Sequence, residues 1–165
     1  MNFNTADLCD EYGEGEIQIA QPLFHSYGGE EHCFGKIRTI RLDEDNRGLA
    51  EMLKNEQGHG DVVVVDVGGA HCAVVGDNLM NFAHKNGWAG IIVNGYVRDT
   101  KITRTIPVGL WALGTYPRRS GKRAPSERDV ELHFAGVTFR PGEYVYADHD
   151  GIVVLEHNAV ALPSS

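Results

Sequence analysis

Residues 61–67 read Asp-Val-Val-Val-Val-Asp-Val, and this unbroken run of β-branched side chains decides the fold class. No polar residue interrupts the four valines, which is typical of a strand that is covered on both faces. Gly68 and Gly69 then break the run. The stretch therefore predicts a buried strand inside a layered α/β domain.

A helix and a second short strand follow. Val75 to Asn86 carries apolar residues at helical spacing, and Gly87 suits the C′ position after the helix. Residues 90–94 (GIIVN) predict the next buried strand. Strand, helix and strand together form one βαβ unit.

The remaining segments predict a mixed α/β chain whose C-terminal half is rich in strands. Thr5 is the expected N-cap of a helix that reaches Tyr12, and Asn46 is that of a helix that reaches about Glu56. Residues 21–35 and 117–125 are expected to be loops, and the second is basic. Asp150-Gly151 predicts a hairpin turn. The expected strands are 34–42, 107–115, 129–134, 137–139, 144–147 and 152–155.

Composition narrows the function classes. The 165 residues carry a formal net charge of −8, which argues against binding of nucleic acid through a basic surface. No apolar run is long enough for a membrane helix, and the first residues lack the features of a secretory signal. The cysteines, which are Cys9, Cys33 and Cys72, form no CxxC pair. We expect one cytosolic domain, residues 1–165, because no linker or repeat divides the chain.

Gly76-Asp77-Asn78-Leu79 opens the predicted helix of the βαβ unit. The first amides of a helix lack intrahelical partners, and the helix dipole favours an anion there. A glycine lets a ligand approach the backbone closely. The alternative is that Gly76 only ends a loop and that Asp77 only favours the helix start.

Arg98-Asp99 follows the second strand, and twenty residues separate Asp77 from Arg98. A guanidinium can hold a carboxylate through two parallel hydrogen bonds. A carboxylate with open coordination positions suits Mg²⁺ or Mn²⁺. The alternative is a local surface ion pair of little energy. No zinc-type ligand spacing and no Gly-x-Gly-x-x-Gly after a strand is present.

This joint spacing resembles the D-x20-R-D motif of the 4-hydroxy-4-methyl-2-oxoglutarate aldolase family, which is homologous to the regulator of ribonuclease E activity A. The resemblance covers most of the chain and includes TADLCD (5–10), NGWAG (86–90), FAGVTF (134–139) and YADHDGI (146–152). It implies a layered α/β/β/α sandwich of the swivelling-domain type with a mixed sheet. It also implies a homotrimer, or a hexamer of two trimers, with sites between subunits.

The resemblance further implies roles for the matching residues. The backbone of Gly76 to Leu79 and the side chain of Arg98 would hold the C1 carboxylate of a small 2-oxo acid. Asp99 would bind the divalent cation, and Asp77 would lie near the waters of that cation. The regulators typically lack the acidic residue after the motif arginine, so Asp99 favours the aldolase branch.

The implied chemistry is a metal-dependent, class II aldolase cleavage of 4-hydroxy-2-oxo acids to pyruvate, with decarboxylation of oxaloacetate through the same enolate. The motif contains no lysine for a Schiff base. It names no base for the C4 hydroxyl; Glu30, Glu31 and His32 are candidates that could serve a neighbouring subunit. The basic residues 118–123 could attract anionic substrates, or form a solvated loop. The rival function is a non-catalytic, protein-binding regulator of ribonuclease E.

Overall fold

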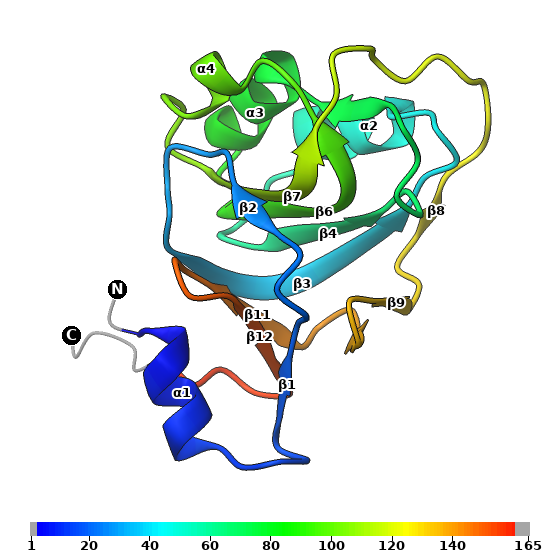
Figure 1. Cartoon of the computed structure of the whole chain (residues 1–165). Helices are drawn as coiled ribbons and strands as arrows, with labels where there is room; N and C mark the ends of the chain where they lie inside the picture. Colours follow the sequence, from blue (N-terminus) through cyan, green and yellow to red (C-terminus); the bar gives the residue numbers. More distant parts are fainter. Residues whose placement is uncertain (1–2, 161–165) are drawn as a thin grey trace.

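The computed structural model describes residues 3–160, which form a small number of helices and many short strands (Figure 1). The helices are α1 (Thr5–Glu11), α2 (Arg47–Asn55), α3 (Asp77–Lys85) and α4 (Thr100–Thr103). The strands before α4 are β1 (Ile17–Ile19), β2 (His25–Ser26), β3 (Cys33–Arg41), β4 (Val62–Asp66), β5 (Ala73–Val75) and β6 (Gly90–Val97). Those after it are β7 (Gly109–Thr115), β8 (Glu127–Arg128), β9 (Leu132–Phe134), β10 (Val137–Phe139), β11 (Tyr144–Ala147) and β12 (Ile152–Leu155).

The long strand β3 joins two halves of one mixed sheet, whose order is β1-β12-β11-β3-β4-β6-β7-β2. Its first residues, Cys33 to Lys36, pair antiparallel with β11. Its later residues, Ile37 to Arg41, pair parallel with β4. The strand therefore carries the chain from the antiparallel half to the parallel half, which also contains β6 and β7.

The four valines of β4 divide between two cores. Val63 and Val65 pack with the apolar residues of α2 and α3, which cover one face of the parallel strands. Val62 and Val64 pack with the C-terminal strands on the other face. All four are completely buried, so the prediction of a strand covered on both faces is confirmed.

A third apolar cluster lies between α1 and the C-terminal strands. In this cluster Leu8 of α1 packs with the buried residues Tyr146, Val153 and Leu155. Helices, parallel strands, antiparallel strands and α1 thus form successive layers, with α2 and α3 above the sheet and α1 below it in Figure 1. The expected layered α/β/β/α fold with a mixed sheet is confirmed.

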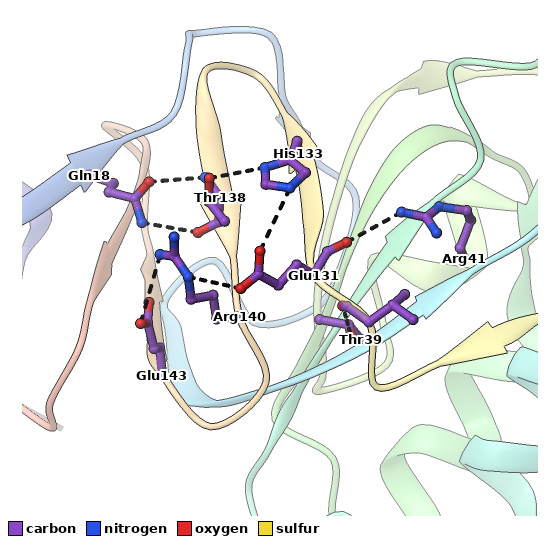
Figure 2. Close-up of polar contacts among 9 residues, drawn as sticks. Gln18, Thr39, Arg41, Glu131, His133, Thr138, Arg140 and Glu143 are labelled. Carbon is purple, nitrogen blue, oxygen red and sulfur yellow. Dashed lines mark hydrogen bonds and ion pairs between the residues drawn. The ribbon is translucent and has the colours of Figure 1, made fainter.

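Polar contacts hold the β9–β10 hairpin and the segment before it to strands β1 and β3 (Figure 2). The side chain of Gln18 donates to the carbonyl of Thr138 at 3.0 Å and accepts from its amide at 2.9 Å. Thr39 donates its hydroxyl to the carbonyl of Val130. The Gln18 side chain thus makes the two hydrogen bonds that a neighbouring strand would make to the backbone of Thr138 in β10.

Several boundary predictions were wrong. The expected strand 129–134 is shortened to β9, because Asp129 has a left-handed φ of 58°. Thr5 is not the N-cap of α1: the Asn4 side chain accepts from the Asp7 amide, and Thr5 instead donates its amide and hydroxyl to Asp148, each at 2.7 Å. Residues 21–35 contain β2 and the start of β3. Helix α3 begins at Asp77 rather than Val75, because residues 73–75 pair with the end of β6 as strand β5.

Candidate active site

The register of two neighbouring strands brings the motif residues together. Strand β5 lies parallel to β6, with Val75 opposite Val97 and with the amide of Arg98 donating to the carbonyl of Val75 at 3.0 Å. Gly76 and Arg98 therefore leave the two strands side by side, and Asp77 and Asp99 follow them. The twenty residues between Asp77 and Arg98 comprise the rest of α3, the connection after it and the whole of β6, so both ends of the motif lie at the same edge of the sheet.

These residues line a cavity of about 350 Å³ at the carboxyl end of the strands. Open α/β sheets commonly bind ligands at this edge. The lining consists of residues 45–47, 73–79, 98–99 and 119–123. All six residues that the sequence motif predicts are therefore in one place.

Asp99 has an unusual backbone and few partners. Its φ of 58° and ψ of 34° place it in the left-handed region, which Asp tolerates better than most residues. The exposed carboxylate accepts one hydrogen bond, from the amide of Asp77 to Oδ2 at 3.3 Å. A Cβ atom on Gly76 would lie 2.5 Å from the same oxygen. Gly76 is therefore needed for space, since the Asp99 carboxylate reaches the start of α3.

Arg98 is half-buried and donates from one guanidinium nitrogen to the carbonyl of Pro117 at 3.2 Å. Neither Arg98 nor Asp99 makes an ion pair within residues 3–160, so the surface ion pair considered from the sequence is not formed. The contact to Pro117 orients the guanidinium and leaves its other N–H groups available for an anion.

The amides of α3 are not all equivalent. The Met80 amide makes the first intrahelical bond, to Gly76, and the Asp77 amide is already bonded to Asp99. Among residues 3–160, the amides of Asn78 and Leu79 have no hydrogen-bond partner. These two amides are unpaired donors at the start of α3, and both residues belong to the cavity lining.

Sequence reasoning missed Asp45 to Arg47 at the start of α2. The Asp45 side chain is 5% exposed and accepts from Arg47 and from the amide of Ala124. The hydrogen bond from the Arg47 guanidinium, with help from the Ala124 amide, holds the pKa of Asp45 well below its ordinary value. Asn46 makes no cap bond and instead donates to the carbonyl of Val74 at 2.9 Å. The pair Asp45-Asn46, just before the predicted helix, was the signal available in the sequence.

The candidate bases from the N-terminal loop are not in this cavity. Within the chain, Glu31 pairs with His149 at 3.3 Å, and His32 contacts the carbonyl of Phe3 at 2.6 Å. Glu30 also lies outside the lining. A larger cavity of about 500 Å³, lined by Phe24, Trp111 and others, contains none of the motif residues.

One further cluster of titratable side chains resembles a relay. His133 lies 3.0 Å from the Thr138 hydroxyl and 3.8 Å from the Glu131 carboxylate (Figure 2). Glu131 is also bonded to Arg140, these groups lie at the surface, and none of them lines the four main cavities formed by residues 3–160. The cluster therefore stabilises the hairpin rather than forming a reaction centre.

Comparisons with known proteins find relatives over most of the chain. A 161-residue match in Alkalilimnicola ehrlichii, named "Putative 4-hydroxy-4-methyl-2-oxoglutarate aldolase", is 44% identical and covers 97% of this chain and 99% of that protein. A protein of the same name from Laribacter hongkongensis is 47% identical over 154 residues, or 93% of this chain and 96% of its own length.

Two solved structures superpose with a TM-score of 0.90. One, from Geobacillus kaustophilus, is described as an S-adenosylmethionine: 2-dimethylmenaquinone methyltransferase; it is 40% identical and covers 98% of this chain and 100% of its own. The other, from Thermus thermophilis, is described as the RNA-processing inhibitor RraA; it is 39% identical and covers 99% of both chains. The names differ, so function must be argued from the site.

The RraA-like family model, described as Aldolase/RraA, matches residues 5–154. This match spans α1 through most of β12 and includes the whole cavity lining. The chain belongs to the RraA-like family.

Proposed function

We propose that this chain, as a single RraA-like domain of residues 1–165, is a divalent-metal-dependent aldolase. It cleaves 4-hydroxy-2-oxo acids of the 4-hydroxy-4-methyl-2-oxoglutarate type to pyruvate, and it decarboxylates oxaloacetate. The observation that carries the proposal is the β5–β6 register, which brings Arg98, Asp99 and the orphan amides of α3 to one cavity. The names of the relatives support the same substrate class.

The residues fit a hard cation. The Asp99 carboxylate is exposed and has no cationic partner within residues 3–160. It lies beside the start of α3, whose first residue is Asp77. Mg²⁺ and Mn²⁺ keep several waters and often bind through only one or two protein carboxylates. No group of three or more potential ligand side chains occurs in the described part of the chain. Asp99 would hold Mg²⁺ or Mn²⁺, with Asp77 hydrogen-bonded to its waters.

The protein groups bind and orient the substrate. The Arg98 guanidinium holds the C1 carboxylate, and the amides of Asn78 and Leu79 donate to the same group at the positive end of α3. When bound, the cation supplies a Lewis acid for the charge that develops on the C2 oxygen. Decarboxylation of oxaloacetate develops charge on the same oxygen, so one arrangement serves both reactions.

The proposal includes a homotrimer, or a hexamer, in the cytosol. Ile19, Leu23 and Ile102 are large apolar side chains that stay exposed in the single chain, and the free thiols of the three cysteines suit a reducing compartment. None of the helices within residues 3–160 is long and apolar enough to cross a membrane. Light scattering on the purified protein would measure the number of subunits.

Pyruvate formation tests the activity. The protein with Mg²⁺ should release pyruvate from 4-hydroxy-4-methyl-2-oxoglutarate and from oxaloacetate, and a chelator should stop both reactions. Asp99→Ala should lose nearly all turnover and keep its fold; because alanine tolerates the left-handed φ of 58° less well than Asp does, its free energy of unfolding should fall by about 1 kcal/mol at most. Pyruvate release no faster than with free Mg²⁺ would contradict the proposal.

The alternative is a non-catalytic regulator of ribonuclease E, and the description of the Thermus structure favours it. Such a regulator acts through surface contacts and needs neither metal nor Asp99. Inhibition of ribonuclease E by the wild type and by Asp99→Ala to the same extent, without turnover, would support this second function.

A further inference from the structure

We propose that Arg119 and Arg123 bind a second carboxylate of the substrate and make the site selective for dicarboxylic 2-oxo acids. This inference rests on the proposed function. It adds the residues that bind the substrate carboxylate at the end opposite C1. It starts from the basic loop 117–123, which the sequence left open between a solvated loop and an anion-attracting patch.

The cavity concentrates positive charge in an acidic protein. Five basic side chains line it, against three acidic ones, although the whole chain carries a formal net charge of −8. The basic ones are Arg47, Arg98, Arg119, Lys122 and Arg123. A wall of this kind attracts anions locally, independent of the net charge.

Three of these five basic side chains already have a hydrogen-bond or ion-pair partner within the protein. Arg47 pairs with Asp45, and Lys122 donates to both carboxylate oxygens of Asp43 at 2.8 and 2.9 Å. The third, the motif arginine, contacts a backbone carbonyl and is assigned to the C1 carboxylate. Within residues 3–160, the guanidinium groups of Arg119 and Arg123 have neither an ion pair nor a hydrogen bond.

The loop that carries them is fixed at several points. The Ala73 amide donates to the carbonyl of Arg118 at 2.7 Å, and the Ser120 amide donates to the carbonyl of Ala73 at 3.0 Å, so Arg119 lies between two backbone bonds to β5. Hydrogen bonds to the 44–45 segment likewise flank Arg123: the Lys122 amide donates to the carbonyl of Glu44, and the Ala124 amide donates to the side-chain carboxylate of Asp45. Anchored backbone lowers the ordering cost of binding a ligand.

The bridge to β5 also supplies an internal control. Successive side chains of an extended segment point to opposite faces. Arg119 accordingly lines the 350 Å³ cavity, whereas Arg118 lies outside it, in a more open hollow that Arg98, Pro117 and Arg119 also line. Two adjacent arginines of the same exposed loop therefore differ in whether they line the cavity at the start of α3, so Arg118→Ala is the control for Arg119→Ala.

The arrangement suits a substrate with an anion at each end. One carboxylate would occupy Arg98 and the start of α3, and the other would meet Arg119 and Arg123, which belong to the loop that completes the same lining. A guanidinium that donates hydrogen bonds to a carboxylate strengthens its binding, and exposure to solvent reduces the gain. We therefore expect each arginine to contribute about tenfold to the preference for a dicarboxylate.

The test compares two substrates that differ only at the distal group. 4-Hydroxy-4-methyl-2-oxoglutarate has the second carboxylate, and 4-hydroxy-4-methyl-2-oxopentanoate has a methyl group in its place. The ratio of kcat/KM for the two substrates should fall about tenfold in Arg119→Ala and in Arg123→Ala. It should stay at the wild-type value in Arg118→Ala. An unchanged ratio in both cavity variants, or an equal fall in Arg118→Ala, would overturn the proposal.

A binding measurement separates this inference from the proposed function. Calorimetry with 2-oxoglutarate and 2-oxopentanoate measures the same contrast without turnover. If the wild type cleaves neither substrate but binds 2-oxoglutarate more tightly, and Arg119→Ala and Arg123→Ala remove that preference, the second carboxylate site stands and the aldolase proposal fails. Equal binding of the two acids by the wild type would overturn the second site whatever the activity.

Discussion

Gly76→Ala is the sharpest test of the site, because it should separate activity from stability. The φ of −138° at Gly76 is open to any residue, so alanine causes no backbone strain. Its Cβ atom would lie 2.5 Å from Oδ2 of Asp99, and its next neighbours are also side-chain atoms of the motif, on Asp99 and Arg98. The fold is therefore expected to accept the methyl group, and the Asp99 carboxylate must move.

The size of that movement follows from the contact distance. Ordinary contact begins at 3.4 Å, so the oxygen must retreat by about 0.9 Å. This retreat breaks the hydrogen bond from the Asp77 amide, which is already 3.3 Å long. Misplacement of a catalytic group by about 1 Å can lower a rate by about 10²-fold. The free energy of unfolding should stay the same or rise by about 0.4–1 kcal/mol, since alanine restricts the unfolded chain.

The assay measures kcat/KM for pyruvate release, Mn²⁺ binding by calorimetry, and urea unfolding of the same protein. Gly121→Ala is the matched control, because Gly121 lines the same cavity and a Cβ atom there meets nothing within 4 Å. We expect Gly76→Ala to lose about 10²-fold in kcat/KM and to bind Mn²⁺ more weakly, with the control unchanged. Wild-type kcat/KM and Mn²⁺ affinity in Gly76→Ala would refute the placement of Asp99 at the start of α3.

Three other predictions address binding and stability. Arg98→Lys should raise KM about tenfold or more with a smaller change in kcat, because lysine lacks the planar fork; steady-state kinetics with an unchanged KM would remove Arg98 from the site. Asp148→Asn should lower the free energy of unfolding by about 1–3 kcal/mol at pH 7. Burial raises the Asp148 pKa, but hydrogen bonds from Thr5 and nearby amides outweigh it and lower the net pKa, so this contribution is present above about pH 4 and is lost as pH falls through the lowered value. Urea unfolding at pH 7 and pH 3 should therefore show a smaller difference from wild type at pH 3. Gly87→Ala should cost about 1 kcal/mol in the same assay at pH 7, because φ is 74° there; no loss would show that the helix end relaxes.

Much of the fold could be predicted from local patterns. The valine run gave a strand buried on both faces because its burial depends only on the chemistry of its own side chains. Gly87 marked the end of α3, and Asp150-Gly151 marked the turn between β11 and β12, because a backbone conformation selects those residue types. The resemblance to a family supplied the layered fold.

Errors arose where a distant segment decided the local structure. Val75 fits the apolar pattern of the following helix, but it belongs to residues 73–75, which pair with the end of β6, where β4 no longer reaches. Thr5 has the chemistry of an N-cap, but Asp148, far along the chain, engages both of its donors. In each case a tertiary hydrogen bond outweighed the local preference.

The sequence by itself determined the residue types of the site and their spacing, and this spacing is one helix followed by one strand, which returns the chain to the same edge of a parallel sheet. Only the tertiary structure decided which donors remain for a ligand: the Asp77 amide is taken by Asp99, whereas those of Asn78 and Leu79 are not. It also decided that the basic loop lines the same cavity as α3. The physical reason is that strand pairing and backbone hydrogen bonds between remote segments set these distances, and no local sequence pattern contains them.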